Sequence, residues 1–171
     1  MKRTRELTIS AMLTALGVVF LLFGTMVEAL DIAALLFASM PIVFAMLELR
    51  RAWPLLLYGA TSVLGVLLFF NLVVLEYILF GGIYPILKYY LEKLPRRLAL
   101  VLKVVCFNLL AFGILALSRR FFGLELEFGK AFWIPILLLA NLTFLIYDLL
   151  MTHLIIRYYR LVRPKIARFL K

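Results

Sequence analysis

Long apolar runs, separated by short charged clusters, are the dominant pattern along this chain. Each run has about the 20 residues that a helix needs to cross the hydrocarbon core of a bilayer, where backbone polar groups must bond within the segment. The pattern therefore predicts an all-α integral membrane protein with six transmembrane helices in a single domain, residues 1–171. The predicted helices are Leu7 to Val27, Ala29 to Leu49, Ala52 to Phe70, Leu72 to Leu91, Leu98 to Leu117 and Ala131 to Ile156.

The composition agrees with this class. Hydrophobic residues make up 66% of the chain and charged residues 16%, and the mean hydropathy is +1.10. So much apolar surface does not fit inside one soluble core. The first run is longer than the apolar core of a signal peptide and no small-residue cleavage pattern follows it, so we expect it to be a retained span.

Basic residues collect in alternate links, which predicts the orientation. The basic side carries the three groups Lys2, Arg3, Arg5; Arg50, Arg51; and Lys93, Arg96, Arg97, and then the tail residues Arg157, Arg160, Arg163, Lys165, Arg168 and Lys171. The other side carries Arg119, Arg120 and Lys130, diluted by Glu125 and Glu127, and elsewhere Glu28 and Asp31. The positive-inside rule then places both termini in the cytoplasm, which requires an even number of spans.

The net charge of +10 is explained by this topology. No basic segment alternates with aromatic residues in a soluble module, so we expect no nucleic-acid partner. Some of the basic residues are candidates for contact with anionic lipid headgroups or a cytoplasmic partner, although such flanks occur in multispan proteins generally.

The fourth run contains more chemistry than a membrane anchor needs. Glu76 and Lys88 are charged residues at membrane depth, where they are expected to face protein or water rather than lipid. Pro85 has no backbone N–H and its ring crowds the carbonyl of Gly81, so we expect a kink beside Gly81 and Gly82. We therefore expect this segment to line a site.

Polar and aromatic residues of the last three predicted helices form a candidate pocket open to the outside. A few polar groups among aromatic rings suit a small organic ligand, although tyrosines also concentrate at the membrane interface without any ligand. The candidate substrate-binding residues are Glu76, Tyr84, Asn108, Trp133, Asn141 and Tyr147.

Two further sets of residues have predicted roles. Lys88 and Asp148 have opposite charge at the same predicted depth, which suggests a structural ion pair, with Glu92 as a competing partner four residues after Lys88. Ala11 and Ala15 lie on one helical face, where another helix backbone can approach closely. Ordinary internal packing would explain the same spacing.

No catalytic constellation is visible in the sequence. There is no phosphate-binding glycine loop and no zinc motif, and His153 and Cys106 are the single residues of their types. We expect Cys106 to be a packing residue and His153 either to face the lipid headgroups or to be satisfied by a hydrogen bond. The interpretation is a protein that is not an enzyme and that uses no metal or cofactor.

The N-terminal segment KRTRELTISAMLTALGVVFLLFG resembles the first helix of the substrate-binding, or S, subunits of energy-coupling factor (ECF) transporters. In that family a short basic tail leads into an Ala-x-x-x-Ala face, matched here by Ala11 and Ala15. The chain's size and six predicted spans are similar as well. The resemblance implies a subunit in a prokaryotic plasma membrane that captures a vitamin or related micronutrient from outside. It also implies docking on a transmembrane coupling subunit driven by two cytoplasmic ATPase subunits.

Two other function classes stay open. The chain also resembles small polytopic scaffold proteins of bacterial cell-shape machinery, in which the inward polar residues would be packing devices only. An ion-coupled carrier working alone would use Lys88 and Asp148 as an ion site. That reading is less favoured because no inverted repeat is visible.

Overall fold

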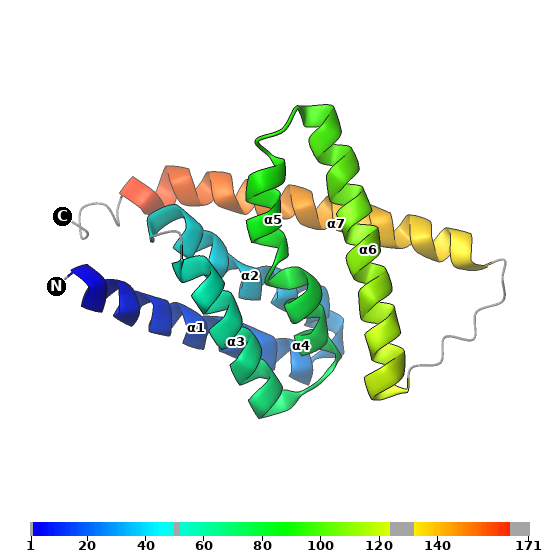
Figure 1. The fold of residues 1–171 in the computed structure, drawn as a ribbon, viewed down its shortest axis with the longest axis horizontal. Coiled ribbons are helices and arrows are strands. Elements are labelled where there is room, and N and C mark those ends of the chain that lie inside the picture. Colours follow the sequence, from blue (N-terminus) through cyan, green and yellow to red (C-terminus); the bar gives the residue numbers. More distant parts are fainter. Residues whose placement is uncertain (1, 50–51, 124–131, 165–171) are drawn as a thin grey trace. The chain divides into compact units, whose positions relative to one another are not determined.

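The computed structural model describes residues 2–49, 52–123 and 132–164, and within these ranges the chain is helical with no strands. It divides into two compact units, Met1–Leu126 and Glu127–Lys171. The α-helices are α1 Lys2–Met26, α2 Asp31–Glu48, α3 Trp53–Phe69, α4 Leu72–Glu76, α5 Tyr84–Leu91, α6 Arg96–Phe122 and α7 Trp133–Arg157 (Figure 1). Several residues named above lie outside the described ranges: Arg50, Arg51, Glu125, Glu127, Lys130, Ala131, Lys165, Arg168 and Lys171.

Among the described residues, five helical segments are long and apolar enough to cross a membrane: Thr4–Met26, Asp31–Glu48, Leu72–Leu91, Arg96–Phe122 and Trp133–Arg160. The apolar helix α3 has 17 residues and is shorter than these. A helix is found at each of the six predicted places, which confirms the all-α class and is compatible with a multi-pass membrane protein. The fifth predicted helix was too short at both ends, because α6 runs from Arg96 to Phe122.

Helices α1, α2 and α3 pack side by side in the first unit (Figure 1). The buried residues of α2 include Ala34 and Ala38, at 6% and 0% exposure. A Cβ on Gly17 of α1 would lie 3.2 Å from the Thr61 side chain of α3. Small residues therefore let the three helices approach closely, as is usual where lipid offers no hydrophobic gain for helix association.

The fourth run is broken into three pieces, as Figure 1 shows between α4 and α5. Asn71 caps α4, its side-chain oxygen accepting from the Val74 amide at 3.1 Å. A π-helical turn, Tyr77–Gly81, follows α4, and α5 then begins at Tyr84 with Pro85 in its first turn. The predicted kink is thus present, and it takes the form of a π-helical turn ahead of the proline.

The two glycines after this turn leave room for neighbouring side chains. A Cβ on Gly82 would lie 2.4 Å from Cδ2 of Tyr58, and one on Gly81 would lie 2.6 Å from Cδ1 of Leu35. From the sequence, these glycines were expected only to make bending easier. Their close contacts show that they also let α3 and α2 approach the break.

The second unit is built on α7, which continues into the π-helical turn Tyr158–Val162. Several of its polar side chains bond to their own helix. The Thr143 and Thr152 hydroxyls donate to the carbonyls of Leu139 and Asp148 at 3.0 and 2.8 Å. A ring nitrogen of His153 lies 2.9 Å from the Leu149 carbonyl, which is consistent with a locally satisfied histidine.

We expect Gly82→Ala to destabilise the protein. The added methyl would collide with the Tyr58 ring, and overpacking of this kind costs about 1–3 kcal/mol. The measurement is unfolding in detergent micelles followed by circular dichroism. Gly113→Ala is the matched control, because a Cβ there meets nothing within 4 Å, and its stability should be unchanged or slightly raised. Equal stability of Gly82→Ala and wild type would contradict the role given to Gly82.

Candidate functional site

The break after α4 frees a backbone carbonyl inside the membrane segment. The Gly82 amide donates to the Tyr77 carbonyl at 2.7 Å, five residues back instead of the four of an α-helix. The Ile78 carbonyl therefore loses the donor it would have in an α-helix. The hydroxyl of Tyr58, from α3, donates to that carbonyl at 2.7 Å, so a side chain replaces the missing backbone bond.

Aromatic rings pack around the same break. Tyr84, a candidate substrate-binding residue, is fully buried and stacks on Phe80 with ring centroids 5.0 Å apart. Phe80 in turn meets the edge of Phe107 on α6 at 5.6 Å. Tyr84 is thus held by ring contacts that join the break to α6, and such rigid aromatic surfaces suit either a packed core or the wall of a ligand site.

Glu76 is the last residue of α4 and its side chain is partly buried. Asp31, the first residue of α2, carries the same charge, and the two carboxylates would repel each other if both were ionised. A cation or a shared proton between them would relieve this repulsion. From the sequence, Asp31 was expected only in a link between helices, and its effect on Glu76 was not predicted.

The two candidate asparagines each use part of their amide locally. Asn108 Nδ2 donates to the Val104 carbonyl of α6, and Asn141 Nδ2 donates to the Leu137 carbonyl of α7, both at 2.8 Å. Asn108 lies next to Phe107, which is part of the ring cluster around Tyr84. The ring contacts therefore join Tyr84 to Phe107 of α6, while the place of the Asn108 side chain in the pocket stays a prediction.

The remaining candidate residues, Trp133, Asn141 and Tyr147, belong to α7 in the second unit. Glu76, Tyr84 and Asn108 belong to the first unit. Whether all six converge on one pocket stays a prediction.

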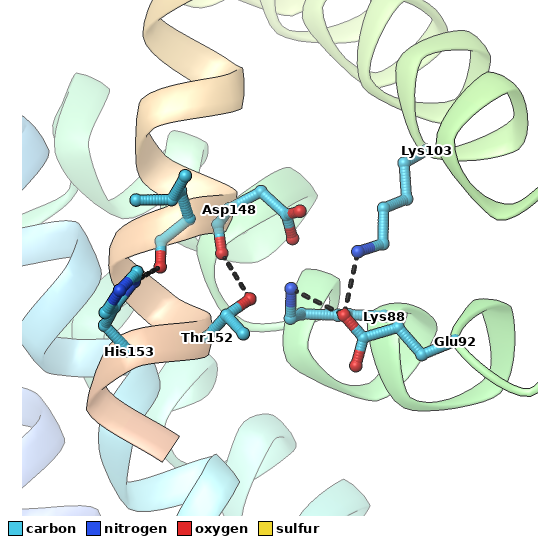
Figure 2. A network of polar contacts seen from close by, with 7 residues as sticks. Lys88, Glu92, Lys103, Asp148, Thr152 and His153 are labelled. Carbon is cyan, nitrogen blue, oxygen red and sulfur yellow. Dashed lines mark hydrogen bonds and ion pairs between the residues drawn. The ribbon is translucent and has the colours of Figure 1, made fainter. Parts of the chain in front are cut away.

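A charge cluster joins α5 to α6. The same oxygen of Glu92, Oε1, lies 2.8 Å from Lys88 Nζ and 2.9 Å from Lys103 Nζ, as Figure 2 shows. Lys88 and Lys103 are only 1% and 8% exposed, whereas the side chain of Glu92 is 45% exposed. Two lysines thus reach from buried positions toward one carboxylate at the end of the helix, an arrangement that avoids lipid-facing charge.

The pKa of Glu92 reflects this cluster. Burial opposes ionisation of the carboxyl, but hydrogen bonds from Lys103 and Lys88 and their positive charges together lower its pKa below the ordinary value. Lys103 was missed in the sequence. A lysine a few residues inside an apolar run, at the same predicted end as Lys88, is the signal that would have found it.

The predicted pair of Lys88 with Asp148 involves residues of different units and stays a prediction. The competing partner named in the sequence, Glu92, does bind Lys88 at 2.8 Å. Within α7 the Asp148 carbonyl accepts the Thr152 hydroxyl (Figure 2).

A groove lies between α1 and α3, on the face that carries Ala11 and Ala15. Its volume is about 510 Å³, and its lining is almost entirely apolar. Ser10 and Thr14 are buried beneath it, the Thr14 hydroxyl donating to the Ser10 carbonyl at 2.9 Å. The lining residues are Leu7, Ser10, Ala11, Thr14, Ala15, Trp53, Leu56, Ala60 and Leu64.

One end of this groove is held by a polar contact. Trp53 Nε1 donates to Glu6 Oε2 at 3.0 Å, joining the start of α3 to α1. The sequence singled out the alanines of α1 but missed the α3 wall. Leu56, Ala60 and Leu64 recur every four residues, the spacing of one helical face, yet in a helix apolar all round this spacing does not stand out.

Comparison of the chain with protein-family models, with curated proteins and with solved structures finds no match.

We expect Glu92→Gln to lower stability at neutral pH, because the amide replaces a carboxylate bonded by two lysines. Since the folded-state pKa lies below that of the unfolded chain, the stabilisation is complete above the unfolded pKa and is lost as pH falls through the folded one. Unfolding of wild type and Glu92→Gln should therefore converge as the pH is lowered below the ordinary carboxyl range. Lys103→Met, which removes one donor, should shift this convergence to higher pH. A difference that does not vary with pH would contradict the assignment.

Proposed function

We propose that this chain is the substrate-capture (S) subunit of an ECF-type importer, docking on a transmembrane coupling subunit. The observation that carries the proposal is the groove between α1 and α3, which contains both Ala11 and Ala15. In this proposal the protein is a multi-pass protein of a prokaryotic plasma membrane with both termini in the cytoplasm, and the cytoplasmic ATPase subunits supply the energy.

The groove has the properties that a transmembrane helix needs in a partner surface. Its walls are apolar, so the groove is compatible with the bilayer. The small side chains of Ala11, Ala15 and Ala60 leave space in it. Small residues allow helix backbones to approach closely, which is how helices associate where lipid removes the hydrophobic driving force. Lipid chains have no such requirement. We therefore assign the groove to a helix of the coupling subunit.

The substrate in this proposal is a vitamin or related micronutrient bound from outside. The binding residues are those predicted from the sequence, Glu76, Tyr84, Asn108, Trp133, Asn141 and Tyr147. The π-helical turn and the ring cluster support a site near the break, because π-helical turns inside helices occur frequently at functional sites. Rigid aromatic walls with few polar groups are typical of small-molecule pockets.

We expect the double variant Ala11→Trp, Ala15→Trp to lose the complex with coupling subunits. Two indoles would fill the groove and keep a partner helix at a distance, so copurification from detergent extracts should fall at least tenfold. The matched control is Met12→Trp: Met12 is 69% exposed on the same helix and does not line the groove.

Wild type that forms no complex with any coupling subunit, or a double variant that copurifies as well as Met12→Trp, would refute the docking assignment. In the first case the scaffold alternative becomes the better account. Each variant should unfold as wild type does, because the groove is on the surface and filling it leaves the core untouched.

We expect mild detergent to extract the protein with a small organic molecule bound, detectable by mass spectrometry after denaturation. Tyr84→Ala should reduce the retained amount at least tenfold, because it removes a ring that lies beside the break. Leu139→Ala is the control, at an exposed position of α7. Retention that is equal in both variants would exclude Tyr84 from the substrate site.

A further inference from the structure

A second hollow lies at the end of the first unit where α2 ends, α3 begins and α5 ends. Its volume is about 200 Å³. Met46 and Ile86 contribute apolar wall, while Leu55, Tyr89 and Tyr90 stand at its rim, each roughly half exposed. This end of the unit is the one to which the basic links were assigned.

A cation is held over the rim. Lys93 Nζ lies 4.2 Å from the ring centroid of Tyr89 and 5.0 Å from that of Tyr90. The two rings meet edge to face at 5.4 Å. Cation–π contacts fix the ammonium beside the hollow and leave its hydrogen-bond donors available for another group.

Two more basic residues follow Lys93 at this end of the unit. Arg96 and Arg97 open α6 and are exposed, and the first turn of α6 contains no acidic residue. Positive side chains at a helix N-terminus oppose the macrodipole. An anion supplied from outside the chain would relieve this unfavourable arrangement.

We propose that this hollow binds an anionic phospholipid of the leaflet that faces the basic links, with acyl-chain methylenes against Met46 and Ile86 and the phosphate beside Lys93. The charge at the rim selects an anion. The side chains of Met46 and Ile86 favour a molecule with a hydrocarbon part, and the hollow is too small for a helix about 10 Å across. This site is separate from the groove between α1 and α3, so it does not depend on partner docking.

The test is native mass spectrometry of the full chain in detergent, titrated with phosphatidylglycerol and with phosphatidylcholine of the same short acyl chains. Wild type should bind phosphatidylglycerol more tightly. Lys93→Gln should weaken phosphatidylglycerol binding about fivefold, the effect of one basic residue near an anionic surface, and weaken phosphatidylcholine binding less, because its choline cation offsets the charge of the phosphate. Leu55→Trp should weaken binding of both lipids by filling the hollow.

The matched control is Arg119→Gln, an exposed basic position at the other end of α6, which should bind both lipids as wild type does. Equal affinity for the two lipids, or equal losses in Lys93→Gln and Arg119→Gln, would overturn the proposal. Glycerol phosphate added at millimolar concentration should not displace the lipid. If it does, the site recognises a soluble phosphate and the lipid assignment is wrong.

Discussion

The structure of the first unit depends on the rule that backbone polar groups away from water need a partner. The hydrogen-bond register changes after α4, and the Ile78 carbonyl loses its helical donor. Tyr58 supplies a replacement from α3 at 2.7 Å. This contact requires the Tyr58 ring to lie against the backbone, and that is possible because Gly82 carries no side chain. The missing side chain of Gly82 thus makes room for the Tyr58 hydrogen bond, and this bond places α3 against the break.

The charged side chains at the end of α5 also need partners away from water. A lysine inside a membrane segment needs an anion, and Lys88 and Lys103 share the Glu92 carboxylate. The long lysine side chains let their ammonium groups reach the less buried end of the helix, where Glu92 keeps some contact with water. The cluster therefore ties α5 to α6 without an isolated charge in hydrocarbon. The lowered pKa of Glu92 expresses the same balance.

Much of this arrangement could be predicted from the sequence. Length and hydropathy located the helices, and Pro85 with its two glycines located the break. The π-helical register and the Tyr58 contact could not be predicted, because they depend on which residue of α3 faces which carbonyl. Lys103 and the α3 wall of the groove were missed for a related reason: a helix that is apolar all round carries no periodic signal to show which neighbour each face meets. For the candidate pocket, the sequence identified residues in both units. Whether these residues meet depends on tertiary geometry, which helical periodicity does not encode.

Helix α3 connects the groove beside α1 with the break between α4 and α5. Leu56, Ala60 and Leu64 face the groove with α1. Tyr58 is two residues from both Leu56 and Ala60, and at about 100° per residue it projects to the opposite side of the helix. There it holds the break between α4 and α5. A partner that binds the groove and a molecule that binds beside the break would therefore contact opposite faces of α3. Two polar contacts, Trp53 with Glu6 at one end and Tyr58 with Ile78 in the middle, resist its movement. Small residues such as Gly17 of α1 add close packing against α3.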